Sequence, residues 1–242
     1  MSDPILQLNN IEAAYGAVKA IRGVSLNVAP GSIVTVLGSN GAGKTTILKT
    51  ISGILDPQKG SIVFRHDKLE GRDPAWIVRQ GLVHVPEGRE IFPLLTVREN
   101  LLMGAYTRPS SQRDEVAKDI EDVFSYFPIL KERTNQPAGQ LSGGQQQMLA
   151  TARALCAKPD FLLLDEPGEG LMPTLVGRLL DTIVALKARR VGVLLVEQKV
   201  DAVLRVADRV ALIENGRIAR HATPAELAAE PEVLLRYVGV RR

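Results

Sequence analysis

The sequence is poor in aromatic residues and in cysteine. Aromatic residues make up 4% of its 242 residues, and it contains three histidines and one cysteine. The single cysteine, Cys156, cannot form an internal disulfide, which fits a reducing compartment. Because Cys156 falls on the apolar face of a predicted helix, we expect a buried thiol. Hydrophobic residues (45%) and charged residues (24%) have the proportions of a globular protein, so disorder is not expected.

The sequence also lacks a strong charge excess and long apolar runs. The net charge is +3 and the basic residues are scattered, so we expect no nucleic-acid partner. Arg241 and Arg242 predict only a solvated basic end. Apolar stretches such as residues 161–164 and 191–196 are far shorter than the ~20 residues that span a bilayer. The first residues show no signal peptide, so we expect that another protein crosses any membrane at which this chain acts.

The order of predicted elements indicates an α/β protein without internal repeats. The length allows one large domain, or a domain with an inserted subdomain. Apolar patterning predicts strands at residues 24–28, 32–37, 161–164, 191–196 and 210–213. Helical spacing predicts helices at residues 44–55, 97–106 and 114–127. Asn215-Gly216 predicts a hairpin to residues 217–220, and residues 223–226 have the pattern of a capped helix start. A helical insertion is expected at about residues 88–155.

A glycine-rich loop lies between one buried strand and one helix. Its sequence, Gly38-Ser39-Asn40-Gly41-Ala42-Gly43-Lys44-Thr45, matches the phosphate-binding pattern G-x-x-x-x-G-K-[ST] in the required context. The glycines let backbone N–H groups point at phosphate oxygens, and the helix start adds a positive dipole end. Lys44 can neutralise the β- and γ-phosphates, Thr45 can ligate Mg²⁺, and Thr46 completes the nucleotide-binding set. This loop alone predicts only nucleotide binding, because a kinase, a GTPase or a motor would begin the same way.

Two carboxylates end a second apolar strand, in the sequence Phe161-Leu162-Leu163-Leu164-Asp165-Glu166. The carboxyl end of a parallel strand is a usual location for ligand chemistry. Asp165 can hold Mg²⁺, and Glu166 can orient and deprotonate an attacking water. An isolated Asp-Glu pair could equally be a solvated strand end, but after a phosphate loop the catalytic interpretation is favoured.

A second anion-binding helix start is predicted at Leu141-Ser142-Gly143-Gly144-Gln145. A serine and two glycines open this helix, and Gln145 is placed to complete a capping box with Ser142. Taken alone, the segment could be an ordinary capped helix with a flexible entry. Together with the phosphate loop about a hundred residues earlier, it indicates a chain with two phosphate-binding helix ends.

In this order, the phosphate loop, residues 141–145 and residues 164–166 resemble the Walker A, signature and Walker B motifs of ABC ATPases. The resemblance extends over residues 5–238. It implies an α/β fold with a P-loop NTPase core and a mostly parallel sheet, an N-terminal antiparallel β subdomain and an inserted α-helical subdomain. It further implies one ABC ATPase domain over residues 1–242, with a RecA-like core (1–87 and 156–242) and a helical subdomain (88–155).

The same resemblance implies how the chain would bind ATP. In ABC ATPases, two cassettes sandwich two ATP molecules, each held by the phosphate loop of one cassette and the signature of the other. Residues 141–145 would therefore serve the partner's nucleotide, and the partner would be a second polypeptide. Tyr15 lies where the family places an aromatic that stacks on adenine, although it could also be a partly exposed strand-end tyrosine. Residues 168–173 correspond to the loop that crosses between cassettes.

Several positions depart from the family pattern. Glu87 stands where a glutamine is usual; a carboxylate can reach Mg²⁺ but cannot donate to a γ-phosphate. Gln198 replaces a histidine, so it can hydrogen-bond the γ-phosphate but cannot carry a positive charge. Met172 replaces the usual aspartate of the crossing loop, and Gly168 replaces a serine or threonine. We expect the site built on Lys44 and Gln198 to hydrolyse more slowly than the site to which this chain contributes only its signature.

Five segments make the resemblance more specific: residues 85–89, 91–93, 95–97, 99–101 and 196–198. Together they are similar to the LivF-type ATPase of branched-chain amino acid importers. This resemblance implies a second ABC ATPase (LivG type, or a homodimer), two transmembrane permeases and, indirectly, a periplasmic or extracellular solute-binding protein. It places the chain on the cytoplasmic face of a bacterial inner membrane, with urea and short amides as alternative cargoes.

The role of residues 91–95 is open from the sequence. These apolar residues could form the groove that binds a permease, or could simply be core.

The rival functions are an ABC ATPase unrelated to transport, a P-loop kinase, and a regulatory nucleotide sensor. The first would carry two cassettes or long heptad arms, and the kinase would have no use for residues 141–145. ATPase turnover with a purified permease would separate the sensor from a transport ATPase.

Overall fold

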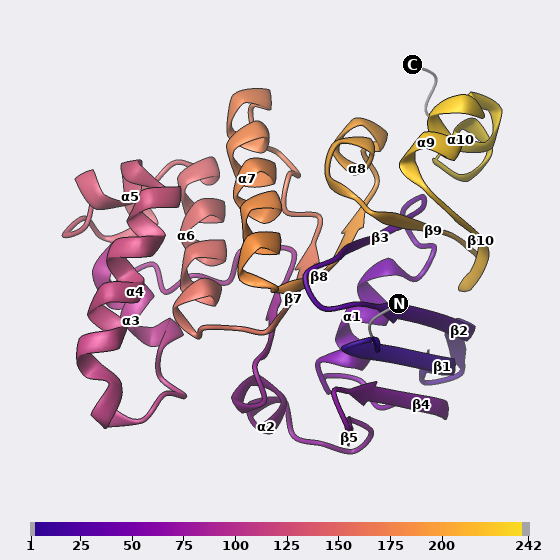
Figure 1. Cartoon of the computed structure of the whole chain (residues 1–242), viewed down its shortest axis with the longest axis horizontal. Coiled ribbons are helices and arrows are strands. Elements are labelled where there is room, and N and C mark those ends of the chain that lie inside the picture. Colours follow the sequence, from indigo (N-terminus) through magenta and orange to yellow (C-terminus); the bar gives the residue numbers. More distant parts are fainter. Residues whose placement is uncertain (1–2, 239–242) are drawn as a thin grey trace.

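The chain folds around two β-sheets in the computed structural model, which describes residues 3–238 (Figure 1). The larger sheet has the order β10-β9-β3-β8-β7-β6, and all of its strands are parallel except β10. Its strands are β3 (Ile33–Leu37), β6 (Leu82–Val85), β7 (Phe161–Asp165), β8 (Gly192–Glu197), β9 (Arg209–Glu214) and β10 (Arg217–Ala222). The smaller sheet is antiparallel, with the order β2-β1-β4-β5. Its strands are β1 (Leu6–Tyr15), β2 (Val18–Val28), β4 (Lys59–Phe64) and β5 (Asp67–Lys68).

Helices cover the larger sheet and extend beyond one of its edges. The α-helices are α1 (Lys44–Ile51), α2 (Pro74–Arg79), α3 (Val97–Gly104), α4 (Arg113–Tyr126), α5 (Pro128–Glu132), α6 (Gly143–Cys156), α7 (Pro173–Leu186), α8 (Val200–Val206), α9 (Pro224–Ala229) and α10 (Pro231–Val238). Residues 3–238 also include the 3₁₀ turns η1 (Ser110–Gln112), η2 (Ala138–Gln140) and η3 (Lys187–Arg189). Helices α3 to α6 lie together at one end of the molecule, on the far side of α7 from the smaller sheet (Figure 1).

Burial explains why the central strands contain so few polar residues. Every residue of β3, β7 and β8 is buried, as expected for parallel strands covered on both faces. Because these three strands are neighbours and parallel, their carboxyl ends lie at one edge of the sheet. That edge positions the phosphate loop after β3, the acid pair after β7 and Gln198 after β8.

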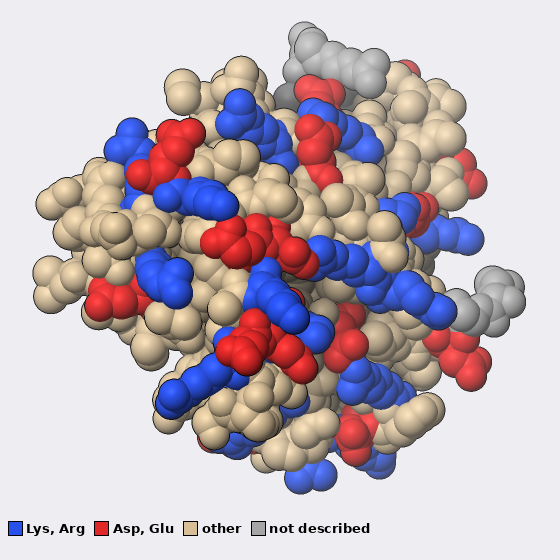
Figure 2. Space-filling model, turned by 60° about the vertical axis from the view of Figure 1, so that its left-hand side comes forward, with Lys and Arg blue, Asp and Glu red and all other residues tan. Residues whose placement is uncertain are grey.

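The helical end has its own buried apolar side chains and a charged surface. Phe124, Phe127 and Met148 are among the residues packed in the cluster that joins α4 and α6 to the sheet. Lys and Arg alternate with Asp and Glu over the face that this end presents in Figure 2. Within residues 3–238, none of the helices combines the length and apolarity that crossing a bilayer demands.

The structure confirms most of the predicted elements. Both capping boxes are present, on Ser142 and on Thr223, and Cys156 is buried. Asn215 and Gly216 form the predicted hairpin turn, with φ values of 48° and 76°. The helix predicted over residues 44–55 ends at Ile51, because the chain turns through Gly53 with a φ of 74°. The basic residues 241–242 lie outside the described part of the chain.

The core interpretation of residues 91–95 is wrong for its central residues. The side chains of Phe92 and Leu94 are 42% and 92% exposed, and Pro93 is also exposed. The loop is held by polar contacts instead: Asn100 is fully buried, accepts from the Phe92 N–H at 2.9 Å and donates to the Phe92 carbonyl at 3.0 Å. The buried Asn100 side chain thereby holds the apolar segment around Phe92 at the surface.

Candidate nucleotide-binding and hydrolysis site

The phosphate loop curls around its own lysine. Lys44 Nζ donates to the carbonyl oxygens of Gly38 at 3.0 Å and Ser39 at 3.1 Å. Gly43 has a φ of 108°, a left-handed conformation that favours glycine. At Gly38, an added Cβ would lie 2.6 Å from the Ile213 carbonyl oxygen, so a side chain there would collide with β9. A tight glycine-rich loop of this kind, ahead of the N-terminus of α1, can present backbone N–H groups to a phosphate.

The acid pair after β7 lies directly against this loop. Asp165 is 1% exposed, and its Oδ1 accepts a hydrogen bond from the Thr45 hydroxyl at 3.2 Å. Burial raises the pKa of Asp165 to about 6, and the Glu87 and Glu166 carboxylates add to the rise, while the Thr45 bond opposes it. The other oxygen, Oδ2, is buried and has no hydrogen-bond partner among the described residues. Asp165 thus presents an oxygen that needs a donor or a cation.

Glu166 forms an ion pair with the phosphate-loop lysine. Its Oε1 lies 3.0 Å from Lys44 Nζ, and its backbone N–H donates to the Val196 carbonyl of β8 at 3.1 Å. Glu166 has a φ of 43°, a left-handed value that is uncommon outside glycine. This conformation turns the chain sharply after β7, so that consecutive acids point to different partners: Asp165 to Thr45, and Glu166 to Lys44.

Glu87 and Gln198 approach the acid pair from either side. Glu87 is exposed in the loop after β6, and its pKa is raised by partial desolvation and then by the Glu169 and Glu166 carboxylates. Gln198 is half-buried after β8 and lines the same groove as Glu166. The structure therefore brings Lys44, Thr45, Glu87, Asp165, Glu166 and Gln198 to one edge of the sheet.

The signature segment lies apart from this edge, with α7 between α6 and α1 (Figure 1). The Gln145 N–H donates to Ser142 Oγ at 3.4 Å, and the Ser142 N–H donates to Gln145 Oε1 at 3.0 Å. A Cβ on Gly144 would lie 2.3 Å from the Leu175 side chain, so glycine permits close packing of α6 on α7. Leu141 anchors the entry and is 5% exposed, while Ser142 is exposed. Within one chain, this helix start does not join the phosphate loop.

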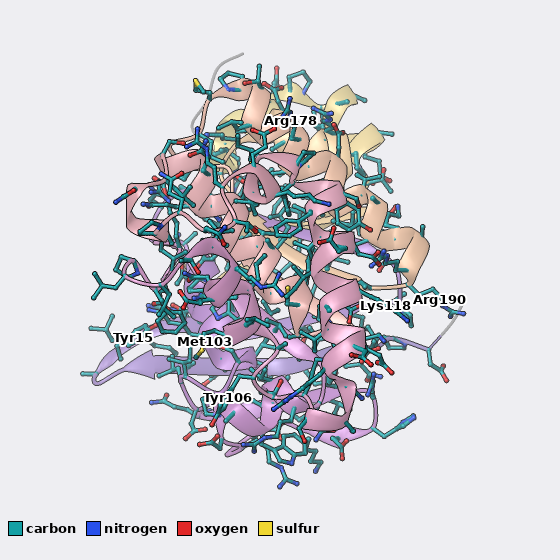
Figure 3. The ribbon with its side chains drawn as sticks, turned by 90° about the vertical axis from the view of Figure 1, so that its left-hand side faces the viewer. Tyr15, Met103, Tyr106, Lys118, Arg178 and Arg190 are labelled. Atoms are coloured by element: carbon teal, nitrogen blue, oxygen red, sulfur yellow. The ribbon has the colours of Figure 1, made fainter. Side chains whose placement is uncertain are left out.

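Tyr15 lies at the tip of the β1–β2 hairpin, where it pairs with Val18. Its side chain is 47% exposed (Figure 3). The same hairpin touches the phosphate loop, because a Cβ on Gly43 would lie 2.9 Å from the Ala20 carbonyl. An exposed aromatic ring is therefore held on the strand pair that supports the loop.

Three residues that the sequence analysis did not single out belong to this region. Arg89 donates to Gln146 Oε1 at 3.1 Å, and its guanidinium covers the backbone at Gly143. Glu197 is 2% exposed at the end of β8, and Lys199 donates to the Gly168 carbonyl at 3.0 Å. Only Glu197 had a readable signal, because it ends an apolar strand as Asp165 does. The partners of Arg89 and Lys199 lie 57 and 31 positions away.

The constellation has the donors and charges to bind a phosphate chain with a hard cation. One ammonium, one hydroxyl and several carboxylates converge beside a helix N-terminus. Among residues 3–238, no group of three or more His, Cys, Asp or Glu side chains is arranged to hold a metal by itself. This arrangement suits Mg²⁺, which protein sites usually hold through one or two carboxylates together with substrate phosphates.

Comparison with known proteins gives a consistent result. Residues 21–169 match the family model described as ABC transporter. The chain is 43% identical over 97% of its length, and 100% of the relative's, to the high-affinity branched-chain amino acid transport ATP-binding protein BraG of Pseudomonas aeruginosa. It is 34% identical, over 92% of its length and 94% of the relative's, to the probable branched-chain amino acid transport ATP-binding protein LivF of Archaeoglobus fulgidus. The crystal structure of the ADP conformation of an ATP-binding cassette of an ABC transporter superposes with a TM-score of 0.86 at 27% identity, covering 99% of this chain and 100% of that one.

Proposed function

The chain belongs to the ABC transporter family of ATP-hydrolysing subunits, and on that premise we propose that it drives a membrane importer for branched-chain amino acids. The observation that carries the proposal is the convergence of Lys44, Asp165 and Glu166 on a chain that also presents a second anion-binding helix start at Ser142. The names of the two relatives above support the cargo.

ATP binding would exchange the present partners of Lys44 for phosphate oxygens. The triphosphate lies along residues 38–46, and Lys44 turns from the Gly38 and Ser39 carbonyls to the β- and γ-phosphates. Glu166 is released from Lys44 in the same step, so its carboxylate becomes free to accept a proton from the attacking water. A positioned general base of this kind accelerates the reaction by ~10²–10⁴-fold.

The residues beside Lys44 fit a magnesium ion. Asp165 Oδ2 is buried and unpaired among the described residues, and the Thr45 hydroxyl lies beside Oδ1. Asp165 and Thr45 would hold the ion, with Glu87 completing the set. When bound, Mg²⁺ neutralises charge on the phosphoryl group that is being transferred.

Two cassettes are proposed to close around two nucleotides. Ser142, exposed just before α6, and Gly144, buried in the first turn of α6, would bind the γ-phosphate held by the partner's phosphate loop. Tyr15 would stack on the adenine of this chain's own ATP. In this assembly, residues 88–155 act as a helical subdomain that carries the signature, and the remaining residues form the core. The partner is a LivG-type cassette or, failing that, a second copy.

The two composite sites of such a dimer would differ. We propose the LivF type for this chain, supported by the segments 85–89 and 196–198, and Gln198 would then face the γ-phosphate in place of a histidine. A glutamine cannot carry positive charge, so the site built on Lys44 is the slower one. Gln198→His should therefore raise the ATPase rate of the assembled complex; an unchanged rate would refute the asymmetry.

The permease is proposed to dock in a groove between the helical end and the sheet. This groove of about 550 Å³ is lined by Phe92, Met103 and Tyr106 together with Arg153 and Glu90. Met103 and Tyr106 both lie on the helical end of the molecule (Figure 3), and their side chains are 42% and 79% exposed. With one of the two transmembrane permeases in this groove and the other on the partner cassette, the chain would stay at the cytoplasmic face of the membrane, with a solute-binding protein on the opposite side.

Reconstituted transport tests the proposed cargo. Proteoliposomes would contain this chain, its genomically neighbouring permeases and second cassette, and the binding protein, with ATP inside. We expect ATP-dependent uptake of leucine, isoleucine or valine, and no uptake with Glu166→Gln. Uptake of urea or short amides alone would assign the alternative cargo. ATP turnover without uptake of any of these solutes would favour a regulatory role.

A further inference from the structure

The crossing loop, residues 168–173, is connected to the turn that carries Gln198. Lys199 Nζ donates to the Gly168 carbonyl oxygen at 3.0 Å, across 31 positions of sequence. Glu197 Oε2 accepts the backbone N–H groups of Gln198 at 3.2 Å and of Lys199 at 3.4 Å. The Glu197 carboxylate therefore fixes the backbone of the turn. The side chain of Lys199 extends from that turn to the crossing loop.

Glu197 also packs against the loop itself. Its side chain is 2% exposed, and its Oε1 has no hydrogen-bond partner in the described part of the chain. A Cβ placed on Gly168 would lie 3.4 Å from this oxygen and 3.5 Å from the Val176 side chain. These are ordinary van der Waals distances, so the loop backbone at position 168 lies directly beside the buried carboxylate. A carboxylate buried with one oxygen unpaired is costly, so its retention calls for a role.

On the side away from the crossing loop, the turn borders a groove. A groove of about 820 Å³ opens between α7 and α8, and Glu166, Glu197, Gln198 and Lys199 all line it. A turn that borders an open groove lacks the interdigitated contacts that fix core side chains. Besides its attachment to β8 and α8, the turn is positioned by hydrogen bonds to Glu197 and from Lys199.

We propose that Glu197 and Lys199 are positioning residues that make the crossing loop and the Gln198 turn move as one unit. This inference rests on the proposed function, in which residues 168–173 contact the partner cassette and Gln198 faces the γ-phosphate. Closure against the partner would then move Gln198 directly, so that hydrolysis in this chain's site depends on the second cassette being seated. Neither residue touches the reacting atoms.

Removing the lysine donor tests the connection. Lys199→Met keeps most of the aliphatic stem but removes the bond to Gly168, whereas Lys199→Arg keeps a donor. In the assembled transporter, we expect Lys199→Met to lower kcat by roughly tenfold or more, as misplacement of a reacting group does. KM for ATP should stay within about twofold, because the phosphate loop is untouched. Lys199→Arg should restore kcat to within about threefold of the natural chain.

A second measurement uses the full chain alone. Amide hydrogen exchange of residues 168–172 should become about fivefold faster or more in Lys199→Met, because the loop loses its connection. Lys158→Met is the matched control. It removes a lysine that is 65% exposed and whose Nζ lies 3.7 Å from Glu115 in a long ion pair, so this exchange should be unchanged. Glu197→Gln retains an acceptor oxygen and should preserve both kcat and exchange, while Glu197→Ala should impair both.

The outcomes separate this proposal from the proposed function. Unchanged kcat and unchanged exchange in Lys199→Met would overturn the positioning role. Equal losses in Lys199→Met and Lys199→Arg would also overturn it, since the donor would then be irrelevant. A natural chain that neither binds nor hydrolyses ATP would refute the proposed function instead, whatever the exchange rates of the variants.

Discussion

The ammonium of Lys44 lies 3.0 Å from Oε1 of Glu166, and their side chains are only 4% and 13% exposed. The two groups that are proposed to act on opposite sides of the γ-phosphate therefore neutralise each other when no nucleotide separates them. Such a pair protects both groups in the resting chain, because an isolated buried charge would be costly. Nucleotide binding would therefore break this pair and release Glu166, the proposed general base, in the same step.

Loss of the Lys44 charge should weaken nucleotide binding. Lys44→Met removes charge-assisted contacts worth about 1.5–3 kcal/mol each, so the Kd for Mg–ATP should rise by roughly 100-fold. Equilibrium binding of labelled ATP measures this change. Lys131→Met is the control, since Lys131 is 62% exposed and pairs with the exposed Glu121. Equal affinities in the two variants would show that Lys44 does not bind phosphate.

Acid should destabilise the fold partly through His84. Burial lowers the pKa of His84 to about 4, from an ordinary 6.5, with a smaller contribution from Lys49. Below pH 6.5 the imidazole of His84 binds a proton in the unfolded chain, whereas in the folded chain it stays neutral down to about pH 4. The free energy of unfolding therefore falls as pH falls through this window. The loss from this group should reach about 3 kcal/mol at pH 4. Urea denaturation at pH 7.5, 5.5 and 4.5 should show a shallower decline in His84→Gln; parallel declines would assign the acid sensitivity to other groups.

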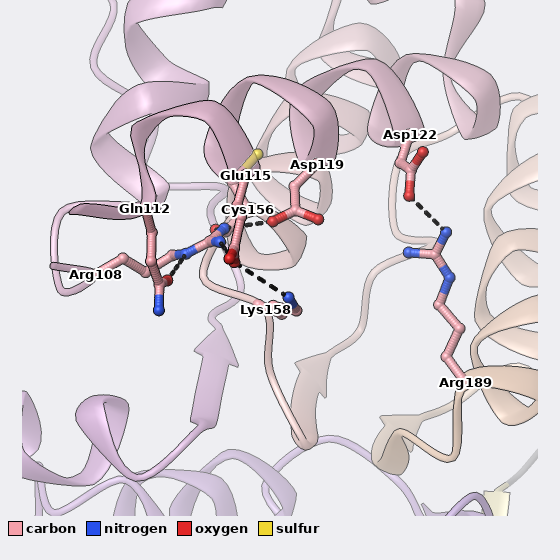
Figure 4. Close-up of polar contacts among 8 residues, drawn as sticks. All are labelled: Arg108, Gln112, Glu115, Asp119, Asp122, Cys156, Lys158 and Arg189. Carbon is pink, nitrogen blue, oxygen red and sulfur yellow. Dashed lines mark hydrogen bonds and ion pairs between the residues drawn. The ribbon is translucent and has the colours of Figure 1, made fainter. Parts of the chain in front are cut away.

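Arg108 should stabilise the helical end through a part-buried polar cluster (Figure 4). Its side chain is 7% exposed, and it donates to Gln112 at 3.0 Å, to Asp119 at 2.5 Å and to the Cys156 carbonyl at 3.3 Å. Arg108→Met leaves those acceptors unpaired and should lower the free energy of unfolding by about 2 kcal/mol. Arg189→Met removes an ion pair with Asp122 in which both side chains are about half exposed, and should cost less than ~1 kcal/mol. Thermal denaturation distinguishes the two variants, and equal losses would contradict the cluster's role.

Local patterns predicted part of the fold and much of the site. The phosphate loop, the acid pair and the capping boxes at Ser142 and Thr223 are each encoded within a few residues, so they could be recognised without tertiary information. The bond from Lys199 to Gly168 joins two distant loops, and no local pattern marks it. For Phe92 the sequence left core and surface both open, because apolar character alone does not reveal burial; Asn100, eight positions later, decides where that loop lies.

The exposed aromatic groove should matter to the permease and not to basal hydrolysis. Tyr106→Ser removes a side chain 79% exposed, far in sequence from the phosphate loop and the acid pair. We expect the ATPase rate of the chain alone to stay within about twofold, while affinity for the permease falls by roughly 30-fold, as for an aromatic anchor. Val18→Ser is the control, because Val18 is an apolar residue that is 70% exposed and lies on β2 of the smaller sheet. Permease copurification and permease-stimulated ATPase measure the effect, and retention of both in Tyr106→Ser would place docking elsewhere.

The most direct test of the account is ATP turnover by Glu166→Gln, measured beside ATP binding in the same assembled transporter. We expect turnover to fall at least ~10²-fold, the contribution of a positioned general base. ATP affinity should be retained or increased, because Lys44 no longer has to leave a charged partner. Turnover at the natural rate, or a loss of ATP binding together with turnover, would contradict the role assigned to Glu166.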